Sequence, residues 1–136
     1  MREPNPGWQG EGTVLIADDE ESVCRIGKMV LERLGFEVIT AMDGLEAVNL
    51  FREHADRINC VLLDLAMPRL EGSRVFDEIQ RIKPGVKVIL CSGYGADESV
   101  QQFAGKGIAG FLQKPYRFAD LQEKFREVFQ GDQFKT

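Results

Sequence analysis

Short apolar runs alternate with segments of helical periodicity along most of the chain. The apolar runs have the length of strands, and between them apolar residues recur every three or four positions, as on one face of a helix. The expected strands are residues 13–17, 36–41, 58–63, 86–91 and 108–112. The expected helices are residues 21–34, 44–54, 72–82, 96–105 and 118–130. Strict alternation of strand and helix predicts an α/β fold, in which a parallel sheet has helices on both faces.

The helical periodicity also indicates which side chains face the sheet. The expected inward positions are Val23, Ile26, Val30, Leu34, Leu45, Val48, Phe51, Val75, Phe76, Ile79, Ile82, Leu121, Phe125, Val128 and Phe129. Together with the apolar strands, these side chains are expected to form the core on the two sides of the sheet.

A chain of 136 residues has the length of one domain, which is expected to cover residues 13–131. Residues 1–12 contain two prolines and three glycines without any periodicity. They are expected to be a flexible linker or arm, and residues 132–136 a C-terminal tail.

The charge balance and the cysteine pattern narrow the class of protein. The chain has 17 Lys and Arg against 22 Asp and Glu, a net charge of −5. This balance and the lack of a basic run argue against direct nucleic-acid binding. No apolar run approaches the ~20 residues of a membrane span, so no membrane insertion is expected. Cys24, Cys60 and Cys91 form no CxxC pair and are expected to be reduced core thiols of a cytoplasmic protein.

Polar side chains stand at the ends of four of the expected strands. Asp18 and Asp19 follow the first strand, Asp64 the third and Ser92 the fourth, while Lys114 stands two residues after the fifth. Each residue alone has a structural explanation, such as capping a helix or facing solvent in a turn. However, the carboxyl ends of parallel strands lie along one edge, where open α/β sheets bind their ligands. The five side chains are therefore expected to meet in one crevice.

Three carboxylates in one crevice need a compensating charge. Two carboxylates ~5 Å apart repel by roughly 3 kcal/mol at an effective dielectric constant near 20. Lys114 offsets one charge, and a divalent cation that prefers oxygen ligands offsets the rest, which points to Mg²⁺. Zinc is disfavoured because the crevice has no Cys or His. The single histidine, His54, is expected on the surface at the polar end of a helix.

Mg²⁺, a lysine and an aspartate together indicate phosphoryl chemistry. An aspartate can attack phosphorus and form a mixed anhydride, which is covalent catalysis by a carboxylate. The metal and the lysine would neutralise charge on the oxygens of the transferred group. The hydroxyl of Ser92 would donate a hydrogen bond to the attached phosphoryl group.

These residues resemble the receiver domain of two-component response regulators. The resemblance covers residues 13–130 and rests on four stretches, IADDE (16–20), LLDLAMPRLEG (62–72), CSG (91–93) and FLQKPY (111–116). It implies a flavodoxin-like (βα)5 fold, a doubly wound parallel sheet with strand order 2-1-3-4-5. It also implies a regulatory phosphoacceptor of phosphorelay signal transduction, which supports its own phosphorylation and dephosphorylation without being a conventional enzyme.

The resemblance assigns roles to the residues of the crevice. It implies that Asp64 is the phosphoacceptor and that Asp18, Asp19, Asp64 and the backbone carbonyl of Ala66 bind Mg²⁺, with Asp19 as a direct ligand. It implies further that Lys114 contacts the phosphoryl group.

Two more residues are implied to switch the domain after phosphorylation. Ser92 would move towards the phosphoryl group, and Phe111, three residues before Lys114, would fill the space that is vacated. The bond between Lys114 and Pro115 is implied to be cis.

The resemblance also implies the partners. The phosphoryl donor would be a phosphohistidine on a histidine kinase or histidine phosphotransfer protein. The surface that changes would consist of the fourth helix, fifth strand and fifth helix, which would bind an unknown output partner or form a phosphorylation-dependent homodimer. The SGY and FLQKPY stretches and the Gly/Pro-rich residues 1–12 are similar to those of hybrid histidine kinase receivers.

Two other functions remain open at the level of sequence. One is an Mg²⁺-dependent phosphohydrolase with Asp64 as nucleophile, although Ala66 stands where such an enzyme needs a second acidic residue. The other is a degenerate receiver that serves only as a binding module, against which the intact crevice argues. In receivers, the positions of Ala66 and Tyr94 flank the path of the hydrolytic water, so these two residues bear on the lifetime of the aspartyl phosphate.

Overall fold

The computed structural model describes residues 10–67, 69–93, 103 and 106–133. The five strands are β1 (Thr13–Ala17), β2 (Glu37–Ala41), β3 (Ile58–Asp64), β4 (Lys87–Ser92) and β5 (Gly110–Gln113). The four described helices are α1 (Glu21–Arg33), α2 (Gly44–His54), α3 (Gly72–Ile82) and α5 (Phe118–Gln133). The predicted helix at 96–105 lies outside the described residues apart from Phe103, so the labels pass from α3 to α5.

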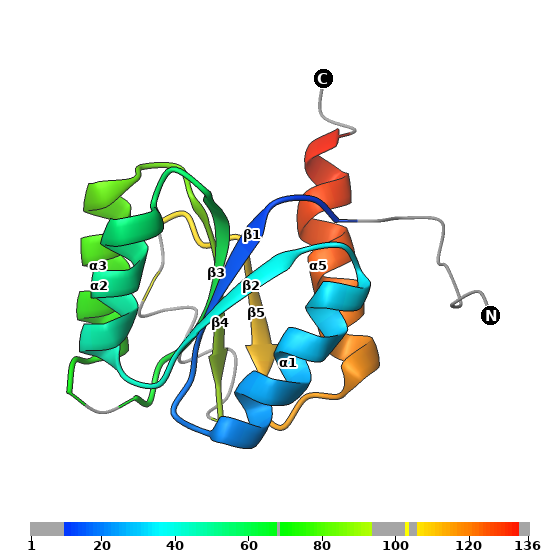
Figure 1. Ribbon diagram of the computed structural model, residues 1–136, viewed down its shortest axis with the longest axis horizontal. Coiled ribbons are helices and arrows are strands. Elements are labelled where there is room, and N and C mark those ends of the chain that lie inside the picture. The colour runs from blue at the N-terminus through cyan, green and yellow to red at the C-terminus, as the bar shows by residue number, and fades with distance from the viewer. Residues whose placement is uncertain (1–9, 68, 94–102, 104–105, 134–136) are drawn as a thin grey trace.

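The strands form one parallel sheet in the order β2-β1-β3-β4-β5. Figure 1 shows α2 and α3 on one face of this sheet and α1 and α5 on the other. This arrangement confirms the predicted flavodoxin-like, doubly wound architecture. Because β1 and β3 are neighbours although β2 comes between them in the chain, the direction of winding reverses between these two strands.

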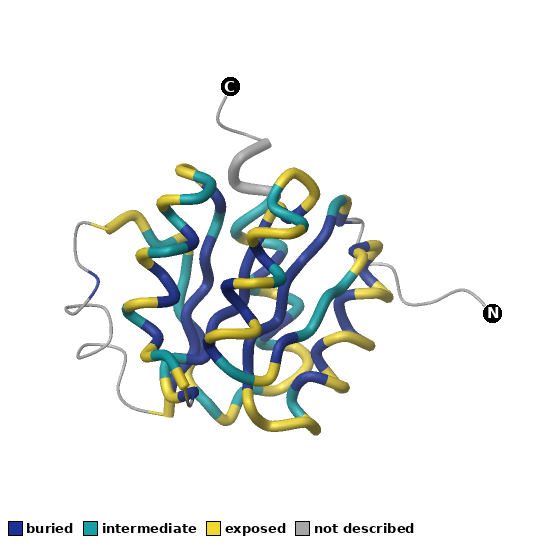
Figure 2. Tube along the Cα trace, turned by 60° about the vertical axis from the view of Figure 1, so that its left-hand side comes forward, coloured by how far each residue is buried: buried dark blue, intermediate teal, exposed yellow. Residues whose placement is uncertain are grey.

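Each face of the sheet carries its own apolar core. The core under α2 and α3 includes Phe51, Val75, Phe76 and Ile79, and the core under α1 and α5 includes residues such as Leu31 and Phe125. Figure 2 shows that the central strands β1, β3 and β4 are buried along most of their length, whereas the edge strands β2 and β5 are only partly buried and the helices are buried on one side. The near-continuous apolar strands of the sequence follow from this cover on both faces.

The strand limits agree with the predicted ranges to within two residues. The differences at the carboxyl ends place two predicted site residues inside strands. β3 includes Asp64 and β4 includes Ser92, one residue beyond each predicted apolar run. Asp64 is in register with Cys91, and Ser92 with Gln113. The strands continue because backbone hydrogen bonding to a neighbouring strand does not depend on whether the side chain is apolar.

The predicted helix faces were wrong at two positions. Ile26 and Leu45 are exposed, by 36% and 40%, and the helices bury the smaller residues Cys24, Gly27 and Ala47 instead. A Cβ atom at Gly27 would lie 3.1 Å from Cδ1 of Ile16 in β1. Helix α1 thus lies close to the sheet at Gly27, a contact that a scan for large apolar side chains overlooks.

The cysteines and the histidine behave largely as predicted. All three cysteines are buried and free. Burial raises the pKa of the Cys60 thiol far above its usual value, which suits an unreactive core residue. The side chain of His54 is 31% exposed at the end of α2, next to Glu53. Among the described residues, no helix combines the length and apolarity needed to cross a membrane.

Candidate functional site

The polar residues predicted to converge do meet at the carboxyl edge of the sheet. Asp18 follows β1, Asp64 and Ser92 end β3 and β4, and Lys114 follows β5. The ammonium of Lys114 lies 3.0 Å from Oδ2 of Asp18 and 3.3 Å from Oδ2 of Asp64. Residues separated by 96 and 50 positions in the sequence are therefore in direct contact. This edge faces downwards in Figure 1.

Three aspartates form a group that fits a metal ion. One ligand oxygen from each of Asp18, Asp19 and Asp64 lies within 4.8 Å of the others. Asp18 and Asp64 are 1% and 2% exposed, whereas Asp19 is exposed to solvent. Carboxylate oxygens at partly open positions suit Mg²⁺, which keeps several of its own water ligands. The donor set therefore fits the predicted ion better than it fits zinc.

The environment of Asp18 disfavours its negative charge. Burial raises the pKa of this carboxyl group, and the nearby charge of Asp64 acts in the same direction. Two contacts oppose the rise: the backbone N–H of Glu20 donates to Oδ1 at 2.9 Å, and Lys114 donates to Oδ2. Adding positive charge at this site would therefore relieve a real electrostatic cost.

Asp64 is held by contacts to both of its carboxylate oxygens. The backbone N–H of Ala66 donates to Oδ1 at 3.1 Å, and Lys114 donates to Oδ2. The end of β3 is held by β4, since the N–H of Leu65, the residue after Asp64, donates to the carbonyl of Cys91 at 3.1 Å. A carboxylate at the end of a paired strand has little freedom, which is the preorganisation that a nucleophile needs.

Lys114 is positioned by its backbone as well as by its charge. Its N–H donates to the carbonyl of Ser92 at 2.8 Å, and the following bond to Pro115 is cis, as the resemblance implied. Burial acts to lower the pKa of the ammonium, but hydrogen bonds to Glu20 and Asp18 outweigh it, so the pKa lies above its usual value. Lys114 therefore carries its positive charge throughout the neutral pH range.

Sequence reasoning missed one partner of Lys114. Oε1 of Glu20 lies 2.6 Å from the ammonium, closer than either aspartate. Glu20 directly follows the acidic pair Asp18-Asp19 and stands at the N-cap position of α1. Its position in the acidic run after β1 could have marked Glu20 as a site residue. Only the fold shows that its side chain contacts a lysine 94 residues away.

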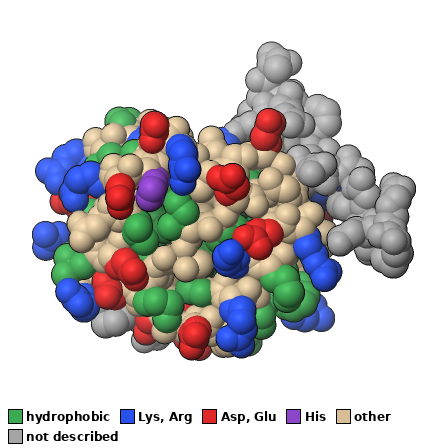
Figure 3. Space-filling view, in the orientation of Figure 1, with side chains coloured by type: hydrophobic (Ala, Val, Ile, Leu, Met, Phe, Trp, Pro, Cys, Tyr) green, Lys and Arg blue, Asp and Glu red, His purple; other side chains and the backbone are tan. Residues whose placement is uncertain are grey.

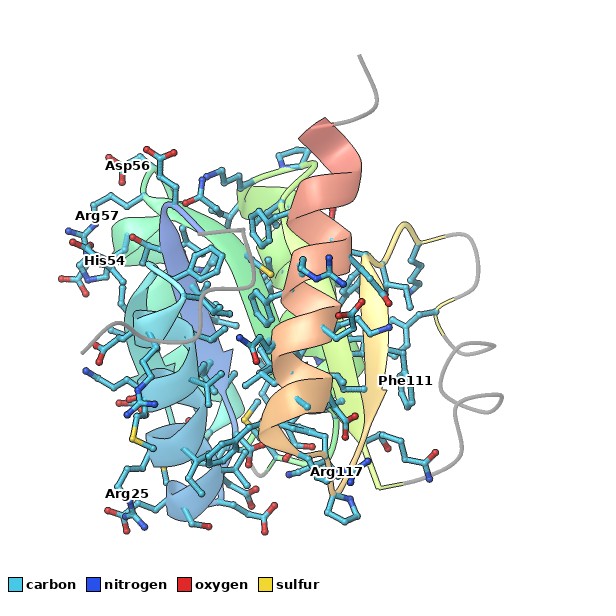
Figure 4. All side chains as sticks on the ribbon, turned by 90° about the vertical axis from the view of Figure 1, so that its right-hand side faces the viewer. Arg25, His54, Asp56, Arg57, Phe111 and Arg117 are labelled. Carbon is cyan, nitrogen blue, oxygen red and sulfur yellow. The ribbon has the colours of Figure 1, made fainter. Side chains whose placement is uncertain are left out.

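Ser92 and Phe111 lie on neighbouring strands. Ser92 is 1% exposed at the end of β4. Phe111, opposite Leu90 in register, is half-buried and packs against the core under α2 and α3. Figure 4 shows its side chain beside β5, the edge strand of the sheet. Tyr94, the second residue predicted to flank the water path, lies outside the described residues.

A pocket of about 1050 Å³ opens at this edge. Asp19, Glu20, Asp64, Ala66 and Lys114 line it together with apolar residues of α1 and of the segment leading into α5. Asp18 is not among the lining residues, so Asp64 is the buried aspartate that borders the open space. A group carried by another molecule can therefore approach the Asp64 carboxylate.

On the face drawn in Figure 3, the acidic and basic side chains of the described residues are interspersed. In Figure 4, Arg25 and Arg117 lie towards the end that holds the acidic group, whereas His54, Asp56 and Arg57 lie at the opposite end. His54 is therefore remote from Asp64 and takes no part in the site.

Comparison with known sequences identifies the family. The family model of the response regulator receiver domain matches residues 14–126. The sensor kinase CckA of Brucella abortus (strain 2308) is 30% identical over 121 residues, which make up 89% of this chain and 13% of the kinase. A probable transcriptional regulator, ycf27, of Guillardia theta is 35% identical over 117 residues, 85% of this chain and 44% of the regulator. The chain thus spans less than half the length of both relatives.

Solved structures agree with this result. A response regulator receiver domain protein from Clostridium thermocellum superposes with a TM-score of 0.81 at 29% identity, covering 92% of this chain and 99% of that one. A chain of the CheX-CheY complex with BeF3 and Mg²⁺ from Borrelia burgdorferi gives a TM-score of 0.81 at 31% identity, covering 87% and 89%. The chain therefore belongs to the response regulator receiver domain family of two-component signalling.

Proposed function

We propose that Asp64 accepts a phosphoryl group from a phosphohistidine on a histidine kinase or histidine phosphotransfer protein. The observation that carries this proposal is the contact of one ammonium, Lys114, with the two buried carboxylates of Asp18 and Asp64. Of these two, Asp64 borders the pocket and Asp18 does not. Membership of the receiver family supports the same role, since receivers are regulatory phosphoacceptors rather than conventional enzymes.

The transfer is a direct displacement at phosphorus. A carboxylate oxygen of Asp64 forms a bond to phosphorus, while the phosphorus–nitrogen bond of the donor breaks and leaves its electron pair on the imidazole nitrogen. A proton on the other ring nitrogen makes the departing histidine neutral. Lys114 places positive charge beside the oxygens of the group as it moves. The product is an aspartyl phosphate, a mixed anhydride.

Asp18, Asp19, Asp64 and the backbone carbonyl of Ala66 would hold Mg²⁺. When bound, the ion supplies positive charge that offsets both the carboxylates and the phosphoryl oxygens. The grouping of the three aspartates within 4.8 Å supports this assignment. The similar chain from Borrelia burgdorferi belongs to a CheX-CheY complex solved with BeF3 and Mg²⁺, which supports the assignment further.

Phosphorylation would switch the domain through Ser92 and Phe111. The Ser92 hydroxyl moves towards the new phosphoryl group, and the ring of Phe111 fills the vacated space. The half-buried position of Phe111 on the edge strand supports this role, because such a side chain can change place without opening the core. The affected surface includes β5 and α5, and it would bind the output partner or a second copy of the chain.

The two curated relatives support different settings for the domain. The match to CckA supports a hybrid histidine kinase, whereas the match to ycf27 supports a response regulator with its own output domain. Both contexts require the same phosphoacceptor chemistry at Asp64.

The test is direct phosphorylation followed by mapping of the product. The protein is incubated with Mg²⁺ and acetyl phosphate, and the adduct is located by mass spectrometry. We expect one labile phosphoryl group on Asp64, which is lost in Asp64→Asn and retained in Asp77→Asn, a control at an exposed aspartate of α3. Continuous hydrolysis of phosphate esters would instead indicate a phosphohydrolase, and no adduct with any donor would indicate a binding module.

A further inference from the structure

The ammonium of Lys114 has all of its hydrogen-bonding capacity in use. It contacts Oε1 of Glu20 at 2.6 Å, Oδ2 of Asp18 at 3.0 Å and Oδ2 of Asp64 at 3.3 Å. An ammonium group has three N–H donors and no acceptor. Three carboxylates therefore match three donors, and before transfer an oxygen of the incoming phosphodonor can bind Lys114 only if one of these three partners releases it.

Of the three partners, Glu20 can release Lys114 at the smallest cost in free energy. The side chains of Asp18 and Asp64 are 2% and 3% exposed, so before transfer either carboxylate would remain buried without compensation if it lost the ammonium. The side chain of Glu20 is 57% exposed, and it makes no capping hydrogen bond to α1 although it stands at the N-cap position. Once released, its carboxylate passes directly into water.

Glu20 also lies where the donor must enter. It lines the same pocket as Asp64 and Lys114. Four carboxylates, Asp18, Asp19, Glu20 and Asp64, stand here against the charge of Lys114. A dianionic phosphodonor that enters this pocket is repelled by Glu20 and competes with it for Lys114.

We infer that Glu20 is a regulatory positioning residue that restrains phosphorylation by holding Lys114 until the phosphoryl group displaces it. This inference rests on the proposed role of Asp64 as phosphoacceptor. With acetyl phosphate, an oxygen of Asp64 bonds to phosphorus while the bond from phosphorus to the acetyl oxygen breaks, and the electron pair leaves with acetate. Glu20 exchanges its contact with Lys114 for water as the donor binds, so its effect falls on donor affinity rather than on the chemical step.

The test compares Glu20→Gln with Glu21→Gln. Glu21 is an exposed acidic residue in the first turn of α1, so its removal gives the same change in net charge next to the site. For each protein, the rate of adduct formation is measured against acetyl phosphate concentration at fixed Mg²⁺. Affinity for beryllofluoride, an inert mimic of the phosphoryl group, is measured by calorimetry, and thermal unfolding verifies that each variant folds.

We expect Glu20→Gln to lower the half-saturating acetyl phosphate concentration and to tighten beryllofluoride binding, with a change below twofold in the maximal rate. The expected factor is about four- to sixteenfold, because a unit charge ~5 Å away in water changes an equilibrium constant by roughly fourfold for each donor charge, and the ligands carry one or two charges. Glu21→Gln should change either quantity by less than about twofold, since Glu21 does not line the pocket and its exposed charge is screened by salt.

Three results would overturn the inference, and each is distinguishable. Equal effects of the two variants would show that Glu20 contributes only to the general charge of the pocket. A loss of Mg²⁺ affinity in Glu20→Gln would make Glu20 a partner of the metal instead of a competitor for Lys114. If the wild type forms no adduct that depends on Asp64, the proposed function itself fails and the inference falls with it.

Discussion

The two ends of the sheet are built on opposite principles. At the carboxyl edge, the side chains of Asp18, Asp64 and Lys114 are between 2% and 15% exposed, and the ammonium of Lys114 contacts both carboxylates. At the amino edge, the rings of Phe36 and Phe125 pack edge to face with their centroids 5.6 Å apart. Phe129 completes this cluster, 5.1 Å from Phe36.

The difference separates stability from function within a single sheet. Burying aromatic rings removes apolar surface from water and stabilises the fold, with a further contribution from ring geometry. Two carboxylates are buried at the carboxyl edge beside a single ammonium group. Removing them from water costs desolvation free energy, which their contacts with Lys114 offset only in part. The stabilisation that the aromatic rings provide at the amino edge therefore offsets the destabilisation that the buried charges cause at the carboxyl edge, where those charges can bind a ligand.

The largest expected effect is at the aromatic cluster. Phe125 is fully buried, and Phe125→Ala leaves a cavity that the surrounding rings cannot fill, so the free energy of unfolding should fall by about 3–5 kcal/mol. Urea unfolding followed by circular dichroism measures the change. The matched control is Phe118→Ala in the same helix, where the ring is 53% exposed and the change should stay within about 0.5 kcal/mol. Similar losses in both variants would contradict the assignment of stability to the amino edge.

An intermediate effect is expected when the charge balance of the site is broken. Lys114→Met removes the ammonium and leaves Asp18 and Asp64 facing each other in a buried position. The free energy of unfolding without metal should fall by about 1–3 kcal/mol, and Mg²⁺ should restore part of the loss. Lys124→Met is the control, because Lys124 forms its ion pair with the exposed Glu127 of α5, at 3.4 Å and away from the acidic group. A variant as stable as the wild type would show that the carboxylates need no counter-charge.

The smallest effect should have the opposite sign. Asp64→Asn removes one of two neighbouring carboxylates but keeps a side-chain oxygen that can accept the N–H of Ala66. The metal-free protein should become more stable by about 1 kcal/mol, as is common when a functional charge is removed. Thermal unfolding in the presence of a chelator measures this gain. Asp77→Asn, at an exposed residue that pairs with Lys106, should change stability by less than about 0.5 kcal/mol, and a destabilised Asp64→Asn would contradict the comparison.

Much of the fold could be predicted because its signals are local. An apolar run of five or six residues or a period near 3.6 requires only neighbouring positions, and the described strands and helices agree with these patterns. The errors at Ile26 and Leu45 have a common cause. Periodicity ranks positions by the size of apolar side chains, whereas the actual contact at Gly27 depends on how closely the helix approaches Ile16.

The residues of the site were also accessible from sequence, since each polar residue follows a strand and the family stretches surround it. The contact between Glu20 and Lys114 was not, because nothing in the sequence measures how far an exposed glutamate reaches across a crevice. Asp64 and Ser92 were predicted just beyond their strands, but the pairing of Asp64 with Cys91 and of Ser92 with Gln113 holds both within the sheet.

The sequence by itself determined the alternation of strand and helix, the identity of the acidic group and its lysine, and the kind of chemistry they allow. Those properties depend on side-chain type and on local spacing. Only the tertiary structure decided that Asp64 borders the pocket while Asp18 does not, and that Glu20 takes the third donor of Lys114. Burial, hydrogen-bond geometry and access are set by segments distant in the chain, so they exist only once the sheet has brought its carboxyl ends together.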